Sequence, residues 1–173
     1  DVLVRGGVEV NLVSINDDLM VSSSHGVMVT TDMSFDMFKE EVVSDGTDEQ
    51  DVMIFPGGMP GSVNLSECEE LMDMMKEHWK DGGSVAAICA APGLVLSQLD
   101  GLEGKSVTCF DGFEAKLIEK GANFIPKPAI RDGRLITGRS AGHALAFGLE
   151  ILTMLKGEET AAKARHSLFL ETI

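Results

Sequence analysis

The chain has 173 residues and a formal net charge of −14 at pH 7, and 44% of its residues are hydrophobic. This length and composition are typical of a single globular domain with one buried core, and they exclude an intrinsically disordered chain. The excess of acidic residues argues against a nucleic-acid partner and against an anionic membrane surface, because both select clustered Lys and Arg.

The first part of the chain predicts short, mixed elements. Residues 1–7, "DVLVRGG", are typical of the last turn of a helix that ends at a left-handed glycine, Gly6 or Gly7. Because one turn does not form alone, we expect residues of this helix to precede Asp1. The pattern then predicts, in order, a strand in 8–15, two short peripheral strands within 19–32, a helical turn at 34–42 and a polar connection at 44–50.

The rest of the chain predicts alternating strands and helices. An apolar strand at 51–58 is stopped by Pro-Gly-Gly, and an amphipathic helix at 66–83 follows, with Ser66 as N-cap and Glu69 at the capping-box position. The later predicted elements are a strand at 84–89, a helix at 92–99, a strand at 105–110, a helix at 112–121, a hairpin at 129–138 around Asp132-Gly133, and helices at 141–157 and 158–171. This order favours an α/β fold, a three-layer sandwich with a mostly parallel sheet.

Cys89 stands where a predicted strand meets a predicted helix, within "AAICAAPG". Ligands collect at the carboxyl ends of parallel strands. Ala87 and Ala91 place small residues two positions before and after the thiol, as in the G-x-S-x-G nucleophile elbow, with Ala for Gly and Cys for Ser. A helix start favours the thiolate, so we expect a reactive nucleophile. The alternative is a small apolar residue at a strand end.

The loop "FPGGMPGS" at 55–62 ends the neighbouring predicted strand. Gly57 and Gly58 allow the backbone to approach closely, and their N–H groups, with that of Ala90, are candidates for an oxyanion hole beside Cys89. The loop lacks the Lys-Ser/Thr of a phosphate-binding loop. The alternative interpretation is a tight turn without a binding role.

The three cysteines, Cys68, Cys89 and Cys109, have no C-x-x-C spacing and cannot all pair within one chain. Free thiols are typical of a reducing compartment, so we expect a cytoplasmic protein. No apolar run reaches the roughly 18 residues of a membrane span. Cys109 lies within a predicted strand and is expected to be a core residue rather than a resolving thiol.

Two stretches together, "DVMIFPGGMPGSVNL" and "VAAICAAPGLVL", resemble the ThiJ/PfpI superfamily, and "DVLVRGGVEV", "GLEGKSVTCF" and "RLITGRSAGHALAFGLEIL" extend the match in the same order. The likeness is to the small ThiJ-like branch that includes deglycases. It implies a flavodoxin-like sandwich, usually a homodimer, with Cys89 as an oxidisable nucleophile and with no metal or cofactor. It also implies that residues 1–173 form a single domain that lacks its first strand and part of its first helix.

The chain departs from the family pattern at two places. The family's glutamate that hydrogen-bonds the sulfur would lie before Asp1. Phe110 stands where some members carry a histidine, which excludes Cys-His catalysis through that position and predicts low turnover. Of the four histidines, His25 and His143 are candidate pocket residues, whereas His78 and His166 are expected to be solvated.

Arg139 and Ser140 match the family segment that approaches the cysteine, and both are candidate pocket residues. The planar fork of donors on Arg139 suits an anionic oxidised sulfur or a substrate carbonyl. A surface ion pair is the alternative role for this side chain.

Three functions stay open at this point. The first is a deglycase or glyoxalase in which Cys89 adds to a reactive dicarbonyl, or to its adduct on a glycated protein. The second is a non-enzymatic oxidative-stress sensor or chaperone that uses oxidation of Cys89. The third is a cysteine peptidase-like hydrolase, ranked last because Phe110 replaces the histidine.

Overall fold

The computed structural model of the protein describes residues 1–41 and 51–170, and a four-stranded sheet in the order β5-β6-β10-β9 lies at its centre. The first three of these strands are parallel, and β9 is antiparallel to β10. The strands are β5 (Val52–Phe55), β6 (Ser84–Ile88), β9 (Ala129–Asp132) and β10 (Leu135–Gly138). The mostly parallel sheet and the hairpin around Asp132-Gly133 are therefore confirmed, whereas the predicted polar connection at 44–50 lies outside the described residues.

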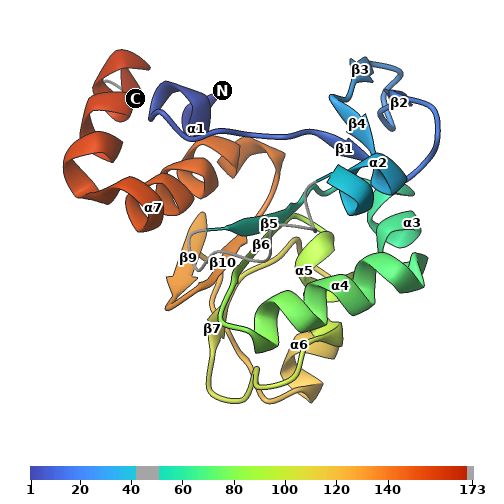
Figure 1. The fold of residues 1–173 in the computed structure, drawn as a ribbon. Helices are drawn as coiled ribbons and strands as arrows, with labels where there is room; N and C mark the ends of the chain where they lie inside the picture. Colours follow the sequence, from blue (N-terminus) through green and yellow to red (C-terminus); the bar gives the residue numbers. More distant parts are fainter. Residues whose placement is uncertain (42–50, 171–173) are drawn as a thin grey trace.

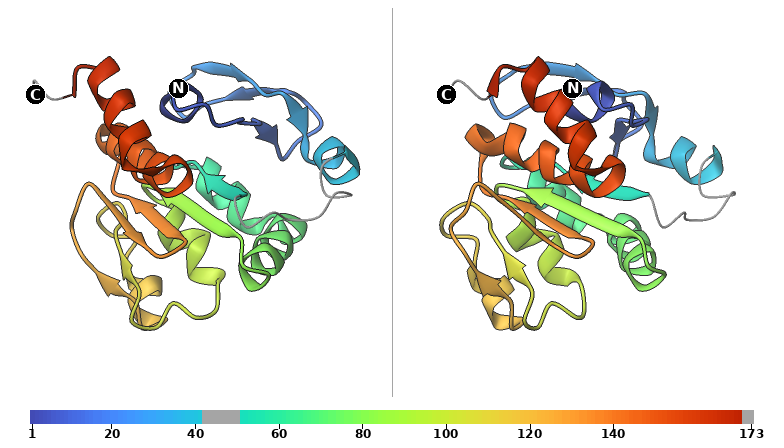
Figure 2. Two further views of the ribbon diagram at one scale, coloured as in Figure 1. Left: turned by 60° about the vertical axis from the view of Figure 1, so that its left-hand side comes forward. Right: turned by 90° about the vertical axis from the view of Figure 1, so that its left-hand side faces the viewer.

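Helices cover both faces of this sheet (Figure 1). Side chains of a strand alternate between the faces. Val85 and Ala87 of β6 belong to the larger core cluster, whereas Ala86 packs with Phe147 and Ile151 on the other face. Figure 2 shows α7 and the helices α3 to α5 on opposite sides of the sheet. The helices are α3 (Gly61–Glu67), α4 (Glu69–Lys80), α5 (Ala91–Leu94) and α7 (Ala144–Ser167). The three-layer α/β prediction is confirmed.

The two helices predicted at the end of the chain are present as one helix with a break. Gly157 inside α7 has φ 81° and ψ 167°, which is not helical, and this glycine separates the two predicted segments. A short 3₁₀ turn, η3 (Ala141–His143), precedes α7. The helix α1 (Val2–Arg5) packs on the first half of α7, because Val2 belongs to the same core cluster as Leu149 and Leu152. Gly7 after α1 has φ 74°, which is the left-handed conformation predicted for the end of this helix.

The N-terminal segment forms small peripheral elements beside the sheet (Figure 1). The predicted pair of short strands is confirmed as the antiparallel hairpin β2–β3, but the strand predicted at 8–15 is limited to two residues. The backbone N–H of Leu12 donates to the Asp32 carboxylate instead of a neighbouring strand. These elements are β1 (Val13–Ser14), β2 (Met20–Ser22), β3 (Met28–Thr30), β4 (Met33–Ser34), which pairs with β1, and α2 (Phe35–Glu41).

The predicted start of the amphipathic helix was wrong. The chain is already helical from Gly61, and Cys68 separates α3 from α4. The Ser66 hydroxyl donates to the carbonyl of Val63 at 2.8 Å, so it caps no helix start, and Glu69 has no capping-box role. A serine inside a helix bonds a preceding carbonyl in this way.

His78 is also corrected, because it is buried rather than solvated. Its side chain is 6% exposed, and Nε2 lies 2.9 Å from the carbonyl oxygen of Ser84. Gly83 leaves room for the ring: a Cβ at this position would lie 2.1 Å from His78 Cε1. His78 therefore connects the end of α4 to the start of β6.

The remaining elements are shorter than predicted. The helix predicted at 92–99 is divided into α5 and a 3₁₀ turn, and a two-residue strand, β8, was missed because so short a segment has no periodicity. These elements are η2 (Leu96–Gln98), β7 (Ser106–Val107), α6 (Ala115–Glu119) and β8 (Asn123–Phe124), which pairs with β7. Within the described ranges, no helix is long and apolar enough to cross a membrane.

We expect Asp132→Asn to lower the free energy of unfolding by about 1 kcal/mol at pH 7. The Ser106 N–H and Lys105 Nζ donate to this carboxylate at 2.8 and 3.0 Å, and they lower its pKa. A lowered pKa stabilises the fold above the ordinary value of 3.8, and this stabilisation is lost as the pH falls through the folded-state value. Urea denaturation of both proteins at neutral and acidic pH checks this, and a stability difference independent of pH would contradict it.

Candidate active site

Cys89 follows β6 directly and has a strained backbone. Its φ is 67°, a left-handed conformation that a residue with a side chain rarely adopts. Its N–H donates to the carbonyl of Gly138 at 2.9 Å, and its carbonyl accepts from the N–H of Phe110 at 2.8 Å. The ends of two neighbouring segments therefore hold the residue in this conformation, as the strained turn of a nucleophile elbow requires.

The predicted glycine loop lies against this cysteine. A Cβ at Gly57 would lie 2.4 Å from Cys89 Cβ, 2.8 Å from the Ile88 carbonyl oxygen and 3.3 Å from Cys89 Sγ. Only glycine fits at this distance. The half-buried thiol of Cys89 consequently faces the backbone of the loop after β5.

The neighbouring Gly58 lies close to the tip of the N-terminal hairpin. Its φ is 95°, and a Cβ built on it would lie 3.8 Å from the Ser24 hydroxyl at the tip of the β2–β3 hairpin. Ser24 in turn lies 3.2 Å from Nδ1 of His25, which is exposed. The hairpin tip therefore borders the glycine loop, and Ser24 is a neighbour of the site that the sequence did not predict.

Phe110 contacts Cys89 through its backbone. Besides its backbone bond to Cys89, its ring meets that of Phe113 edge to face, with ring centroids 6.5 Å apart. The side chain is 46% exposed. An apolar, partly solvated ring thus occupies the position next to the cysteine backbone.

Arg139 follows β10, immediately after the glycine that accepts the Cys89 N–H. Its Nη2 donates to Asp111 Oδ1 at 2.6 Å, and the carboxylate is well exposed. The other terminal nitrogen, Nη1, is buried and has no hydrogen-bond partner among the described residues. The predicted surface ion pair is present, but it uses only one side of the guanidinium. No local pattern indicates the role of Asp111, because the two residues are 28 positions apart.

Ser140 and His143 pair with each other at the start of α7. The Ser140 hydroxyl lies 2.8 Å from His143 Nδ1. Ser140 thus lies just after the end of β10, and its hydroxyl is the hydrogen-bond partner of the His143 ring.

Cys109 is fully buried in the larger core cluster. Burial, together with the nearby carboxylate of Glu114, raises the pKa of this thiol to about 12, while Arg139 opposes the rise. An un-ionised, inaccessible thiol supports the prediction that Cys109 is a core residue.

We expect the wild type to lose about 2–3 kcal/mol of stability between pH 8 and pH 11 through this thiol. The raised pKa stabilises the fold fully below the unfolded value of 9.0, and the contribution is lost as the pH rises toward about 12. Cys109→Ala removes the ionisation, so its unfolding free energy should fall less over the same range. Denaturant titrations at the two pH values measure this, and parallel losses in both proteins would refute it.

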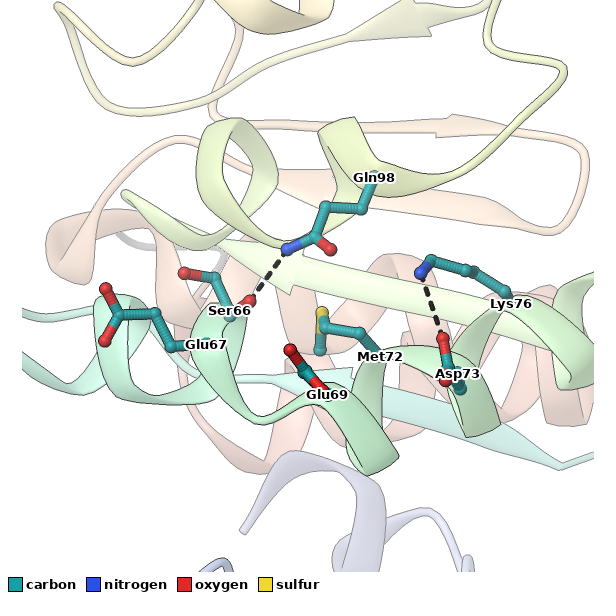
Figure 3. Close-up of a pocket in the computed structure, with 7 residues that line it drawn as sticks. All are labelled: Ser66, Glu67, Glu69, Met72, Asp73, Lys76 and Gln98. Carbon is teal, nitrogen blue, oxygen red and sulfur yellow. Dashed lines mark hydrogen bonds and ion pairs between the residues drawn. The ribbon is translucent and has the colours of Figure 1, made fainter.

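One hollow of the described surface lies elsewhere (Figure 3). It measures about 500 Å³ and lies between α3, α4 and η2. Its lining is mostly polar and includes three acidic residues: Ser66, Glu67, Glu69, Met72, Asp73, Lys76 and Gln98. None of these residues surrounds Cys89. In the part of the chain that the structure describes, no group of three or more His, Cys, Asp or Glu side chains is placed to hold a metal ion.

Comparison with known proteins gives an independent finding. The model of the DJ-1/PfpI family matches residues 1–154. Protein DJ-1 homolog A of Arabidopsis thaliana is 34% identical over 170 residues, which are 98% of this chain and 41% of that protein, so the chain spans about two fifths of this relative's length. The glutathione-independent glyoxalase DJR-1.2 of Caenorhabditis elegans is 32% identical over 92% of this chain and 80% of that protein. The structure of oxidized Toxoplasma gondii DJ-1 superposes with a TM-score of 0.85 at 28% identity, covering 98% of this chain and 87% of that one.

Proposed function

Because the chain belongs to the DJ-1/PfpI family, we propose that it is a cysteine-dependent glyoxalase or deglycase, with Cys89 as the nucleophile. The observation that carries this proposal is the strained Cys89 backbone pressed against Gly57. A residue held in this conformation at a strand end is typical of a functional site. The Caenorhabditis elegans relative, which is named a glyoxalase, supports the choice of reaction.

The reaction begins when the Cys89 thiolate attacks the aldehyde carbon of a 2-oxoaldehyde such as methylglyoxal. A carbon–sulfur bond forms, the carbonyl electron pair moves to oxygen, and protonation gives a hemithioacetal. The hydrogen on this carbon then leaves as a proton and the neighbouring carbonyl carbon gains one, which oxidises the first carbon to a thioester and reduces the second to an alcohol. Water cleaves the thioester and releases the 2-hydroxy acid and the thiol. No external oxidant is needed. On a glycated protein, Cys89 would displace the protein amine or thiol from the former aldehyde carbon, which gives the same hemithioacetal and releases the protein with its proton restored.

Backbone donors of the site support stabilisation of the oxyanion in the first step. Within residues 1–41 and 51–170, the N–H groups of Gly57, Gly58 and Ala90 donate to no protein acceptor. Backbone N–H groups beside a nucleophile stabilise the charge that develops on the carbonyl oxygen. We assign this role to the three residues.

A second candidate role is oxidative-stress sensing through Cys89. Hydrogen peroxide and one proton convert a thiolate to sulfenic acid with release of water, and a second peroxide gives sulfinic acid with release of another water. The relative from Toxoplasma gondii was solved in an oxidized form, which favours this alternative. The same N–H groups would bind the sulfinate oxygens.

We further propose that the protein is a homodimer. We also propose that residues 1–173 form one domain and that the protein works in a reducing, cytoplasmic compartment. Apolar side chains are exposed along the β2–β3 hairpin: Met20, Val27, Met28 and Val29. Contiguous exposed apolar groups mark interaction surfaces. The three cysteines are free, which fits a reducing compartment.

The deciding experiment follows methylglyoxal consumption and lactate formation by the purified protein. The variant Cys68→Ser/Cys109→Ala, which keeps Cys89 as its only thiol, serves as the matched control and should retain the turnover. Steady-state lactate formation by both proteins supports the enzyme. Peroxide-dependent mass gain at Cys89 without lactate formation would reject the enzyme and favour the sensor.

A further inference from the structure

The Arg139 guanidinium has a donor that the described residues leave unused. Nη2 is bonded to Asp111, but Nη1 is buried without an acceptor among the residues that the structure describes. Buried polar groups of proteins are nearly always hydrogen-bonded, and leaving a charged donor unpaired is costly. The position of this nitrogen therefore points to an acceptor that is not among the described residues, such as a bound ligand.

This donor belongs to a residue at the same sheet edge as the candidate nucleophile. Gly138, the residue before Arg139, accepts the Cys89 N–H, and Phe110, the residue before Asp111, donates to the Cys89 carbonyl. Arg139 and Asp111 therefore each follow a residue that is bonded to Cys89. Arg139 and Cys89 also both lie close enough to the buried Cys109 thiol to influence its pKa.

The Asp111 carboxylate does not cancel this positive charge for a bound ligand. Its side chain is 74% exposed, whereas that of Arg139 is 23% exposed. Water and salt screen an exposed charge much more than a buried one. A ligand carboxylate at Nη1 would therefore experience a net attraction, and the planar guanidinium fork suits a carboxylate better than a neutral carbonyl.

We propose that Arg139 makes the site selective for anionic substrates, namely 2-oxoaldehydes that carry a carboxylate beyond the dicarbonyl unit. This inference rests on the proposed function and names its substrate class. Nη1 binds the substrate carboxylate, and the aldehyde carbon lies at Cys89 Sγ. The bond changes are those of the methylglyoxal reaction, so 4,5-dioxopentanoate would be converted to 2-hydroxypentanedioate without an added oxidant.

Alkylation tests the anion site without requiring turnover. Iodoacetate and iodoacetamide form the same carbon–sulfur bond and release iodide, but only iodoacetate carries a carboxylate. In the wild type, we expect the ratio of their rates at Cys89 to exceed the ratio at Cys68, which is flanked by Glu67 and Glu69. Arg139→Gln should lower the Cys89 ratio about tenfold. Asp111→Asn should raise it, and the Cys68 ratio should not change in either variant.

Steady-state kinetics separates this inference from the proposed function. We expect kcat/KM for 4,5-dioxopentanoate, relative to methylglyoxal, to fall about tenfold in Arg139→Gln through a higher KM. Arg139→Lys keeps the charge and should recover part of the preference, which also guards against a folding defect in the glutamine variant. Turnover of both substrates with no dependence on Arg139 would overturn the inference and leave the function standing. Absence of all turnover would reject the function, and the alkylation ratios would still decide the anion site.

Discussion

Replacing Cys89 by serine is expected to lower kcat/KM for methylglyoxal by at least about a thousandfold. A serine hydroxyl is nearly isosteric with the thiol, but it is far less ionised at neutral pH and is a weaker nucleophile. The backbone strain at φ 67° is retained, because it comes from the bonds to Gly138 and Phe110 rather than from sulfur. Initial rates of lactate formation over a range of methylglyoxal concentrations measure the loss.

The matched variant for this test is Cys68→Ser, which makes the same chemical change at a half-buried cysteine between α3 and α4. It should keep the wild-type rate. Circular dichroism and thermal melting of both variants separate a catalytic effect from unfolding. If Cys89→Ser kept more than about a tenth of the activity, a different group would be the nucleophile and the elbow would be structural.

Local sequence patterns were sufficient to predict the sheet and the position of Cys89. The apolar runs that become β5 and β6 are each bounded by glycine or by small residues, and Ala87, Cys89 and Ala91 repeat the steric pattern of an elbow. The close contact between Gly57 and Cys89 follows from the same logic, because parallel strands that are neighbours end at the same edge. Chain order and side-chain size determine these features.

The features that the sequence did not predict depend on distant partners. Asp111 and Arg139 meet because Phe110 and Gly138, the residues before them, are both bonded to Cys89, and Asp111 has no local motif. His78 looked like a solvated helix residue, but the missing side chain of Gly83 leaves space for its ring. Ser66 looked like a cap because the helix before it was not expected. Tertiary packing decides the first two features, whereas Ser66 was assigned wrongly at the local level, since its acceptor is the carbonyl of Val63 three residues earlier.

Gly57→Ala is expected to lower kcat/KM by about a hundredfold and the free energy of unfolding by about 2 kcal/mol. The new methyl group would lie 2.4 Å from Cys89 Cβ and 2.8 Å from the Ile88 carbonyl oxygen. The cysteine cannot rotate away from this clash, because its backbone N–H and carbonyl are both bonded. Either the loop after β5 retreats and removes its N–H groups from the reacting oxygen, or Cys89 shifts.

Gly61→Ala is the matched control for this prediction. It makes the same substitution in the same loop, at the first residue of α3, where a Cβ would meet nothing within 4 Å. Its activity should be unchanged and its stability should change by less than about 1 kcal/mol, since alanine suits a helix better than glycine. Equal activity losses in the two variants would show that the loop needs glycine for flexibility. A loss confined to Gly57→Ala would show that close contact between this backbone and the Cys89 side chain positions the nucleophile.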